Sequence, residues 1–166
     1  IIRLKAEVDQ WLQISKGGSN PYAEQQSGEQ SRGPMQIELP EHGSLVSHPA
    51  LMPIIEQLMG PGFAYHHLHT ARHDAGMQGV NWHHDYEQHP QTNRSHCMAH
   101  VFYYLNGLDG TIGDLMVLPR SQRLVCDRGL SMFGQGTLPG TVVIDDLPPG
   151  SAVIVHSAVW HARRAK

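Results

Sequence analysis

The spacing of apolar residues in the first part of the chain predicts two helices. In residues 1–14 apolar side chains recur with the period of one helix face, at Ile1, Leu4, Val8, Trp11 and Leu12. A second helix is expected over residues 49–59, where a proline suits the first turn and Gly60-Pro61-Gly62 ends the helix. Residues 22–34 between them are polar and have no period, so we expect a loop there.

Beyond residue 62 the pattern changes to short apolar runs separated by turn residues, which is typical of β-strands. The candidate strands cover residues 64–71, 99–105, 114–118, 141–144 and 152–156. Helices followed by many short strands predict a mainly β fold, a barrel or sandwich with helices packed outside it, and a jelly roll is one such fold. We expect a single domain, with a helical flank over about residues 1–62 and a β-barrel core over about residues 63–161.

Composition and charge narrow the function classes. The chain has 166 residues, 16% of them charged, and a formal net charge of −3, which gives no basic surface for nucleic acid and no cationic face for a membrane. No apolar run reaches the roughly 20 residues that span a bilayer. Cys97 and Cys126 form neither a disulfide framework nor a CxxC zinc motif, so we expect an intracellular, cytoplasmic location. The chain starts without methionine and stops in a basic stretch, so further sequence, targeting signals included, is expected at both ends.

Thirteen histidines are the main compositional outlier, and they favour metal chemistry with imidazole and carboxylate ligands over thiolate chemistry. The densest stretch is Asn81-Trp82-His83-His84-Asp85-Tyr86. In an extended segment residues i and i+2 face the same way, so His83 and Asp85 point together and His84 points away. With a third ligand they would form one face of a metal and leave positions open, as in non-haem Fe(II) oxygenases. The alternative is an exposed loop with a hydrogen bond between His and Asp. Trp82 and Tyr86 flank the pair and are expected to shape a substrate pocket.

The third ligand is expected from the last segment of the chain, which offers two histidines. Residues 148–156 are predicted to form a turn and a buried strand that ends at His156. His161 follows Trp160 just past this strand, where a side chain would line the mouth of a barrel. We favour His161 as the ligand and expect His156 to be a core histidine.

Three segments in this order resemble the phytanoyl-CoA dioxygenase (PhyH) family of Fe(II)/2-oxoglutarate-dependent oxygenases. They are Trp82-His83-His84-Asp85, then residues 113–122 with the sequence GDLMVLPRSQ, then Pro149-Gly150-Ser151 through His156 and His161. Members of that family carry a WHxD segment, a GxLxxxPGSH-like segment and a closing segment with two spaced histidines. The resemblance runs from about Pro49 to His161, roughly two thirds of the chain.

The resemblance implies a double-stranded β-helix, a cupin-like jelly roll, that binds Fe(II) through His83, Asp85 and His161 as its catalytic residues. It implies 2-oxoglutarate and O2 as co-substrates, with decarboxylation to succinate coupled to hydroxylation of an unactivated C–H bond in a small organic substrate. Ascorbate would serve as a reductant. Halogenating relatives carry a small residue in place of the carboxylate, so Asp85 implies a hydroxylase. The primary substrate and the oligomeric state stay open.

The chain departs from the family pattern in two places. Family members follow the distal histidine with Gly-Ser-x-x-Asn and, some ten residues later, an arginine that binds the far carboxylate of 2-oxoglutarate. Here Ala162-Arg163-Arg164-Ala165-Lys166 follows, so that arginine is expected beyond Lys166, with Arg163 as the alternative. In the second segment Arg120 and Gln122 replace the glycine and the histidine of the family, which leaves the role of that loop open.

The segment His66-His67-Leu68-His69 allows further interpretations. As a strand before the segment of His83 and Asp85 it would present the face of Tyr65, His67 and His69 to the pocket, where Tyr65 and His67 are expected to contact 2-oxoglutarate or the substrate. The alternative is a surface strand with solvated imidazoles. The spacing of His67 and His69 is also similar to a zinc-hydrolase motif, but Ala71 and Arg72 stand in place of its Asp and His. The alternatives to an oxygenase are therefore a zinc hydrolase at this segment and a cupin-like protein that binds a metal or a small ligand.

Overall fold

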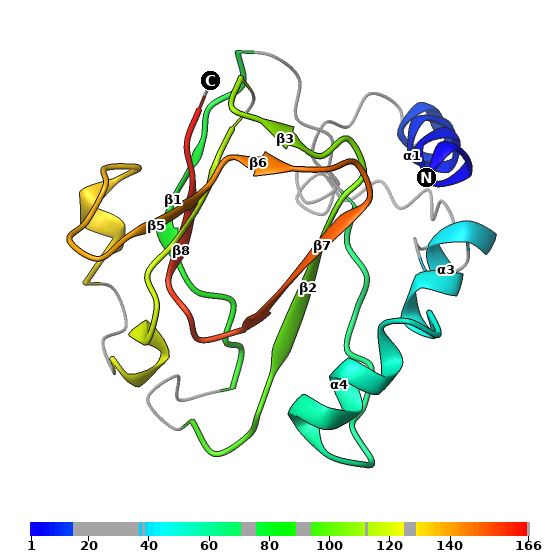
Figure 1. Cartoon of the computed structure of the whole chain (residues 1–166), viewed down its shortest axis with the longest axis horizontal. Coiled ribbons are helices and arrows are strands. Elements are labelled where there is room, and N and C mark those ends of the chain that lie inside the picture. Colours follow the sequence, from blue (N-terminus) through cyan, green and yellow to red (C-terminus); the bar gives the residue numbers. More distant parts are fainter. Residues whose placement is uncertain are drawn as a thin grey trace, which may run out of the picture. The chain divides into compact units, whose positions relative to one another are not determined.

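The computed structural model describes residues 1–14, 37, 39–70, 76–88, 94–111, 113–124 and 129–165. The chain forms two compact units, Ile1–His73 and Asp74–Lys166. The first contains the described α-helices and the second contains the described strands (Figure 1). The predicted loop over residues 22–34, the segment 71–75 and Cys126 lie outside the described residues. Within the described part of the chain, no helix has both the length and the apolar character needed to cross a membrane.

In the first unit, one carboxylate joins two helices. Helix α1 (Ile2–Ile14) confirms the first predicted helix. Its buried side chains are Leu4, Val8 and Trp11. Helix α3 (Pro40–Val46), which the sequence pattern does not predict, begins without a side-chain cap of its own. The carboxylate of Glu7 supplies acceptors there, because it accepts the N–H groups of Glu41 and His42 and the Nδ1–H of His42 at 2.8–3.0 Å.

Helix α4 (Met52–Met59) confirms the second predicted helix but begins later than expected, after a turn at residues 49–51. It ends at Gly60, whose φ of 80° is the left-handed conformation that glycine adopts without strain. Ile55 is buried, whereas Ile54 and Leu58 are 46% and 58% exposed. The apolar side chains of this helix are therefore only partly buried.

The predicted strand at residues 64–71 is wrong for the part that the structure describes. Residues 63–70 form no β-ladder, and of residues 64–70 only Thr70 is buried. A strand needs a partner and a face to bury, and the histidines of this segment offer little apolar surface. The short run between turn residues is therefore not enough to make a strand here.

The second unit is built from short strands. They are β1 (Val80–His83), β2 (Ala99–Tyr104), β3 (Leu108–Asp109), β4 (Leu115–Val117), β5 (Val142–Ile144), β6 (Asp146–Leu147), β7 (Ser151–His156) and β8 (His161–Arg163). Two 3-10 helices, η2 (Ser121–Arg123) and η3 (Ser131–Phe133), lie between β4 and β5 in the sequence. The predicted strands at residues 99–105, 114–118, 141–144 and 152–156 are confirmed as β2, β4, β5 and β7. The sequence pattern does not predict β1, β3, β6 and β8.

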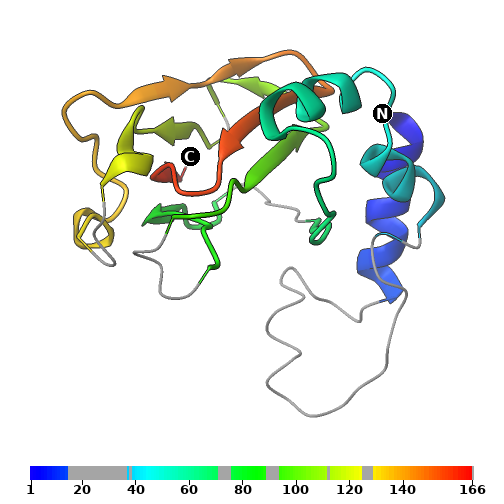
Figure 2. The same cartoon turned by 90° about the horizontal axis from the view of Figure 1, so that it is seen from below.

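The strands pair antiparallel throughout. One sheet has the order β1-β8-β4-β5, while β2 pairs with β7 and β3 pairs with β6. In Figure 1 the β2–β7 pair lies on one side of this unit and β1, β5 and β8 lie on the other, and Figure 2 gives the same strands from below. The chain is thus mainly antiparallel β with a few short helices, as the sequence predicts.

The core of the second unit lies on one face of the four-stranded sheet. It is a cluster of Trp82, Met116, Trp160 and Ala162, with Leu118, Leu130 and Leu138 packed against it. Met116 and Ala162 are direct partners across β4 and β8. Neighbouring residues of a strand point to opposite faces, so His161 faces away from this core.

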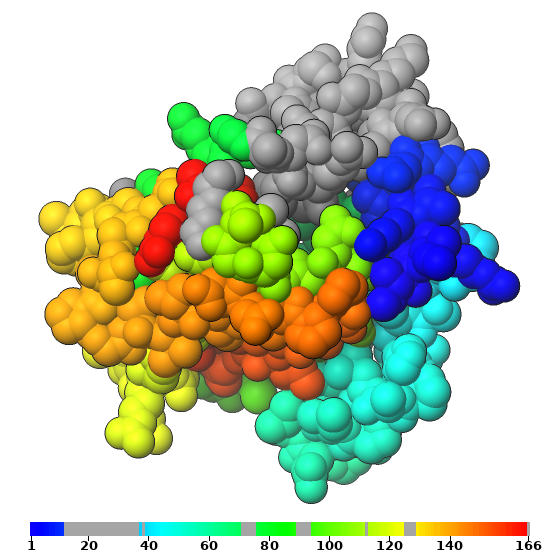
Figure 3. Space-filling model, turned by 45° about the horizontal axis from the view of Figure 1, so that its top comes forward, coloured from blue at the N-terminus to red at the C-terminus, as the bar shows by residue number. Residues whose placement is uncertain are grey.

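Apolar residues also remain on the outside of this unit. Figure 3 shows the segment from about residue 130 to residue 150, coloured yellow to orange, on the molecular surface. The exposed apolar residues of this segment are Met132, Phe133, Val142 and Val143.

Candidate metal centre

The register of β1 and β8 brings two of the predicted ligands face to face. His83 at the end of β1 and His161 at the start of β8 are partners in the ladder, and their ring centroids lie 4.2 Å apart. The carboxylate of Asp85 reaches both rings, with Oδ1 3.5 Å from His83 Nε2 and Oδ2 3.3 Å from His161 Nε2. One ligand atom from each residue lies within 4.8 Å of the other two, so this group could hold a metal ion.

Backbone carbonyls fix the orientation of both imidazoles. His83 Nδ1 is 2.7 Å from Asn81 O, and His161 Nδ1 is 3.0 Å from Val159 O. A carbonyl oxygen can only accept, so each Nδ1 donates its proton and the neutral ring keeps its lone pair on Nε2. Both Nε2 atoms face the carboxylate of Asp85. Metal-binding histidines are usually held in this way, by a hydrogen bond from the other ring nitrogen.

The backbone of Asp85 is held as well. Its N–H donates to Ser157 O at 2.9 Å, and the N–H of Ser157 donates to Met98 O at 2.9 Å. Ser157 is 1% exposed, so this support lies inside the unit. The turn after β7 therefore sets the position of the carboxylate next to β8.

The ionisation of these groups is coupled. Burial raises the pKa of Asp85, but the hydrogen bond from His161 and the charges of three nearby histidines outweigh burial, so this pKa is lowered. Burial lowers the pKa of His161, but the bonds to Asp85 and to Val159 O outweigh burial, so this pKa is raised. For His83 burial and the neighbouring His161 dominate, and its pKa is lowered. Of the two histidines, His161 therefore holds a proton more strongly than His83 does.

One face of β2 lies beside this group. His100, Phe102 and Tyr104 occupy alternate positions of β2 and share a face. The Phe102 ring lies 5.3 Å from the His161 ring and 6.2 Å from the His100 ring. His100 Nδ1 is 2.7 Å from the buried hydroxyl of Ser157. These residues were not among the predicted site residues, although the period of two in the predicted strand at residues 99–105 identifies them as one face.

Arg163 lies two residues after His161 and on the same face of β8. Its guanidinium donates to Gln78 O, and its Nε is buried without a hydrogen-bond partner among the described residues. Burial lowers the pKa of Arg163 and the nearby Tyr104 opposes this shift. Burial also raises the pKa of Tyr104 to about 12, against the effect of Arg163. A partly buried cation with a buried, unused N–H group is suited to bind an anion.

Trp82 and Tyr86, which are predicted to shape a substrate pocket, are both buried. Trp82 is 0% exposed and belongs to the core cluster, where its Nε1–H donates to Gly136 O at 2.7 Å. Tyr86 is 1% exposed, and its hydroxyl lies 2.6 Å from Gln88 Oε1 and 3.3 Å from the N–H of His96. The two buried rings, whose polar atoms are hydrogen-bonded, support the segment that carries His83 and Asp85 and expose no surface to a ligand.

The other two histidines of the candidate segments lie outside the group. The ring of His84 packs edge-on against Trp160 with centroids 5.0 Å apart. The ring of His156 is stacked parallel to Tyr86 at 6.3 Å, and its Nδ1 accepts a backbone N–H at 3.0 Å. His161, rather than His156, is thus the histidine of the last segment that joins His83 and Asp85.

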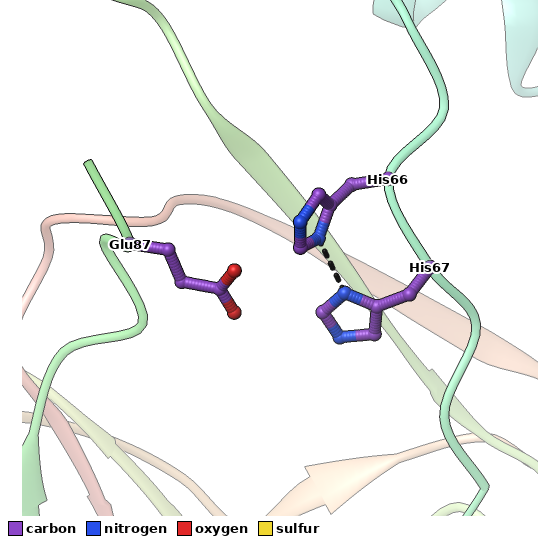
Figure 4. A group of neighbouring side chains, drawn as sticks. All are labelled: His66, His67 and Glu87. Carbon is purple, nitrogen blue, oxygen red and sulfur yellow. Dashed lines mark hydrogen bonds between the residues drawn. The ribbon is translucent and has the colours of Figure 1, made fainter.

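The histidines around residue 67 belong to the first unit. Figure 4 shows the rings of His66 and His67 turned toward each other, and their Nδ1 atoms share a hydrogen bond. Burial and the neighbouring His67 lower the pKa of His69. Tyr65 is 43% exposed. That Tyr65 and His67 contact a co-substrate stays a prediction.

Comparisons of this chain with family models, with curated proteins and with solved structures gave no match. Its function is therefore inferred from its own residues. They provide a candidate metal centre of two imidazoles and one carboxylate, in which backbone hydrogen bonds hold every member.

Proposed function

We propose that this chain is an oxygenase that depends on Fe(II) and 2-oxoglutarate and hydroxylates a small organic substrate. The observation that carries the proposal is the group of His83, Asp85 and His161, in which both Nε2 atoms face one carboxylate while both Nδ1 atoms bind the backbone. Two histidines and one carboxylate on one side of a metal leave its other side open, which is the ligand set of non-haem Fe(II) oxygenases. A structural zinc site is instead closed by four protein ligands.

The accessibility of the three side chains fits an open metal site. The side chain of His161 is 7% exposed, whereas those of His83 and Asp85 are 39% and 28% exposed. His161 and the core behind it would exclude water from one side, and the side of His83 and Asp85 would admit exogenous ligands. Bound Fe(II) would supply the activation of O2 for decarboxylation of 2-oxoglutarate and hydroxylation of a C–H bond.

The order of the strands supports a double-stranded β-helix. Along the chain, β1 lies in the four-stranded sheet, β2 in the β2–β7 pair, β4 and β5 in the four-stranded sheet, β7 in the pair, and β8 again in the four-stranded sheet. Alternation between two sheets is typical of jelly rolls. In such a fold the metal would lie between the sheets, with β1 and β8 on one side and β2 on the other.

Arg163 and Tyr104 are the candidates to bind the far carboxylate of 2-oxoglutarate. The guanidinium of Arg163 has an unused, buried Nε–H on the same face as His161, and its planar shape suits a carboxylate. The pKa of Tyr104, about 12, keeps its hydroxyl protonated and able to donate a second hydrogen bond. The carboxylate of Asp85 favours hydroxylation over halogenation, because it occupies the position that a halide would need.

The test is an anaerobic titration of the protein with Fe(II), with and without 2-oxoglutarate, followed by visible absorption. A charge-transfer band that requires both components, and that Asp85→Ala abolishes, is the expected result. Asp146→Ala is the matched control, since Asp146 is an exposed carboxylate on β6 of the same unit. Arg163→Ala should keep Fe(II) binding and weaken the band at low 2-oxoglutarate. Tight zinc binding without any band would contradict the proposal and favour a cupin-like binding protein or a zinc hydrolase.

A further inference from the structure

The backbone of Trp160, the residue before His161, is bound on both sides by one short segment. The N–H of Leu118 donates to Trp160 O at 2.9 Å. The N–H of Trp160 donates to the hydroxyl of Ser121 at 2.8 Å, in a fully buried hydrogen bond. The segment from Leu118 to Ser121 therefore binds both backbone polar groups of Trp160, the residue next to a candidate metal ligand.

The geometry of the segment directs Ser121 inward. Arg120 has a φ of 68°, which places it in the left-handed region that favours glycine. The chain turns there, and the N–H of Ser121 donates back to Leu118 O at 3.2 Å. Ser121 is 2% exposed as a result.

The side chain of Trp160 adds no hydrogen bond to a described residue that would restrain its backbone. Its indole is 2% exposed and lies in the core cluster, and its Nε1 has no hydrogen-bond partner among the described residues. The hydrogen bond that orients the His161 ring, from Nδ1 to Val159 O, spans the Trp160 residue. A change in the Trp160 peptide would therefore turn the His161 ring away from Asp85.

We infer that Ser121 is a positioning residue, whose hydroxyl fixes the backbone at Trp160 so that His161 Nε2 points at Asp85. The functional role that this inference gives to Ser121 rests on the proposed metal centre. Without the hydroxyl, the buried N–H of Trp160 would have no acceptor, and the backbone would shift to find one. Ser121 thus acts on the metal through the orientation of His161 and does not contact the metal.

The test compares Ser121→Ala with Ser121→Thr, which keeps a hydroxyl, and with Thr141→Val. Thr141 is the matched control, because its Oγ1 also accepts a backbone N–H, that of Leu138 at 3.0 Å, in the turn before β5. The first readout is the NMR signal of the His161 ring in the metal-free protein. The second is the dissociation constant for Co(II), a spectroscopic substitute for Fe(II).

Ser121→Ala should shift the His161 ring signal and weaken Co(II) binding by about tenfold, the lower end of the effect of residues that orient metal ligands. Ser121→Thr should restore both, and Thr141→Val should change neither. An unchanged His161 signal in Ser121→Ala, or an equal loss of Co(II) affinity in Thr141→Val, would overturn the inference. If the unmutated protein binds no Co(II), the proposed metal centre fails, and the NMR comparison still decides the role of Ser121.

Discussion

Trp82 and Trp160 pack in one core cluster, and each of them directly precedes a histidine of the candidate metal group. Because neighbouring residues of a strand point to opposite faces, burying the two indoles on one face of the sheet places His83 and His161 together on the other. The two rings are partners across the β1–β8 ladder. The same two strands therefore carry the core on one side and the site on the other.

The first prediction concerns this coupling of core and site. Trp82→Ala removes a side chain with 0% exposure and its hydrogen bond to Gly136 O, so the free energy of unfolding should fall by about 3–5 kcal/mol. Chemical denaturation measures the loss. Phe133→Ala, at a position 51% exposed, serves as the control and should stay within about 0.5 kcal/mol of the unmutated protein. A small effect at Trp82 would mean that the cluster is not a core.

His161→Ala and His156→Ala should have opposite profiles. His161 Nε2 faces Asp85, so its loss should reduce Co(II) affinity by at least about 100-fold. His156 stacks on Tyr86 and accepts a backbone N–H, so its loss should lower the melting temperature and leave Co(II) affinity nearly unchanged. Isothermal titration and thermal melts of both variants provide the comparison. Equal loss of Co(II) affinity in both would contradict the assignment of His161.

The two histidines of the group should titrate in a defined order. The pKa of His161 is raised above the ordinary value of 6.5 by Asp85, and the pKa of His83 is lowered by burial and by His161. In the metal-free protein, NMR should therefore show His161 losing its proton at a higher pH than His83. A metal needs both rings neutral, so Co(II) affinity should fall as the pH drops through the raised pKa of His161. His83 titrating above His161 would refute this electrostatic description.

In the first unit, acid should weaken the contact between Glu7 and helix α3. Burial raises the pKa of Glu7, but hydrogen bonds from Glu41 and His42 outweigh burial and lower it below the ordinary 4.5. A carboxyl group whose pKa is lower in the folded protein than in the unfolded chain stabilises the fold at pH values above the unfolded pKa. This stability is lost as the pH falls through the folded pKa. Glu7→Gln should therefore lower the melting temperature at pH 7 and reduce its dependence on pH below about 4.5. An unchanged acid profile in Glu7→Gln would argue against this role.

Arg120→Gly should stabilise the protein slightly. Arg120 has a φ of 68°, and replacing a side chain in this left-handed conformation by glycine relieves strain of about 1–2 kcal/mol. Glycine also has more conformational freedom in the unfolded chain, which offsets part of this gain. Urea denaturation should give a net gain of about 0.5–1 kcal/mol. Arg123→Gly, in the 3-10 helix η2 three residues later, should destabilise by a similar amount and is the control. A loss of stability at both positions would show that the Arg120 side chain makes contacts that outweigh its strain.

The part of the candidate site that is formed by residues close together in the sequence could be predicted. His83 and Asp85 share a side because they are two residues apart in an extended segment, and this holds whatever the rest of the fold is. Pairing of β1 with β8 joins residues far apart in the sequence, and the strands are too short to show a period. The groups that orient the ligands, Ser121 and Ser157, come from turns whose positions depend on that pairing.

The strand predicted at residues 64–71 is wrong in its described part because strand formation also depends on residues elsewhere in the chain. An alternating pattern is necessary for a half-buried strand, but a partner strand and an apolar face decide whether one forms. In the described part of this segment only Thr70 is buried. In contrast, residues 99–105 are mostly apolar, and residues 99–104 form β2, which pairs with β7 along its whole length.

The place of β8 in its sheet has a consequence for how the protein assembles. β8 is the last described strand, yet it lies between β1 and β4. During synthesis β1 and β4 leave the ribosome well before β8 and have no neighbour to hold them together, so the sheet closes only when β8 inserts between them. The insertion that completes the sheet also delivers His161 to His83 and Asp85. A nascent chain that ends before this strand would therefore lack the candidate metal centre of His83, Asp85 and His161, which forms only as the sheet is completed.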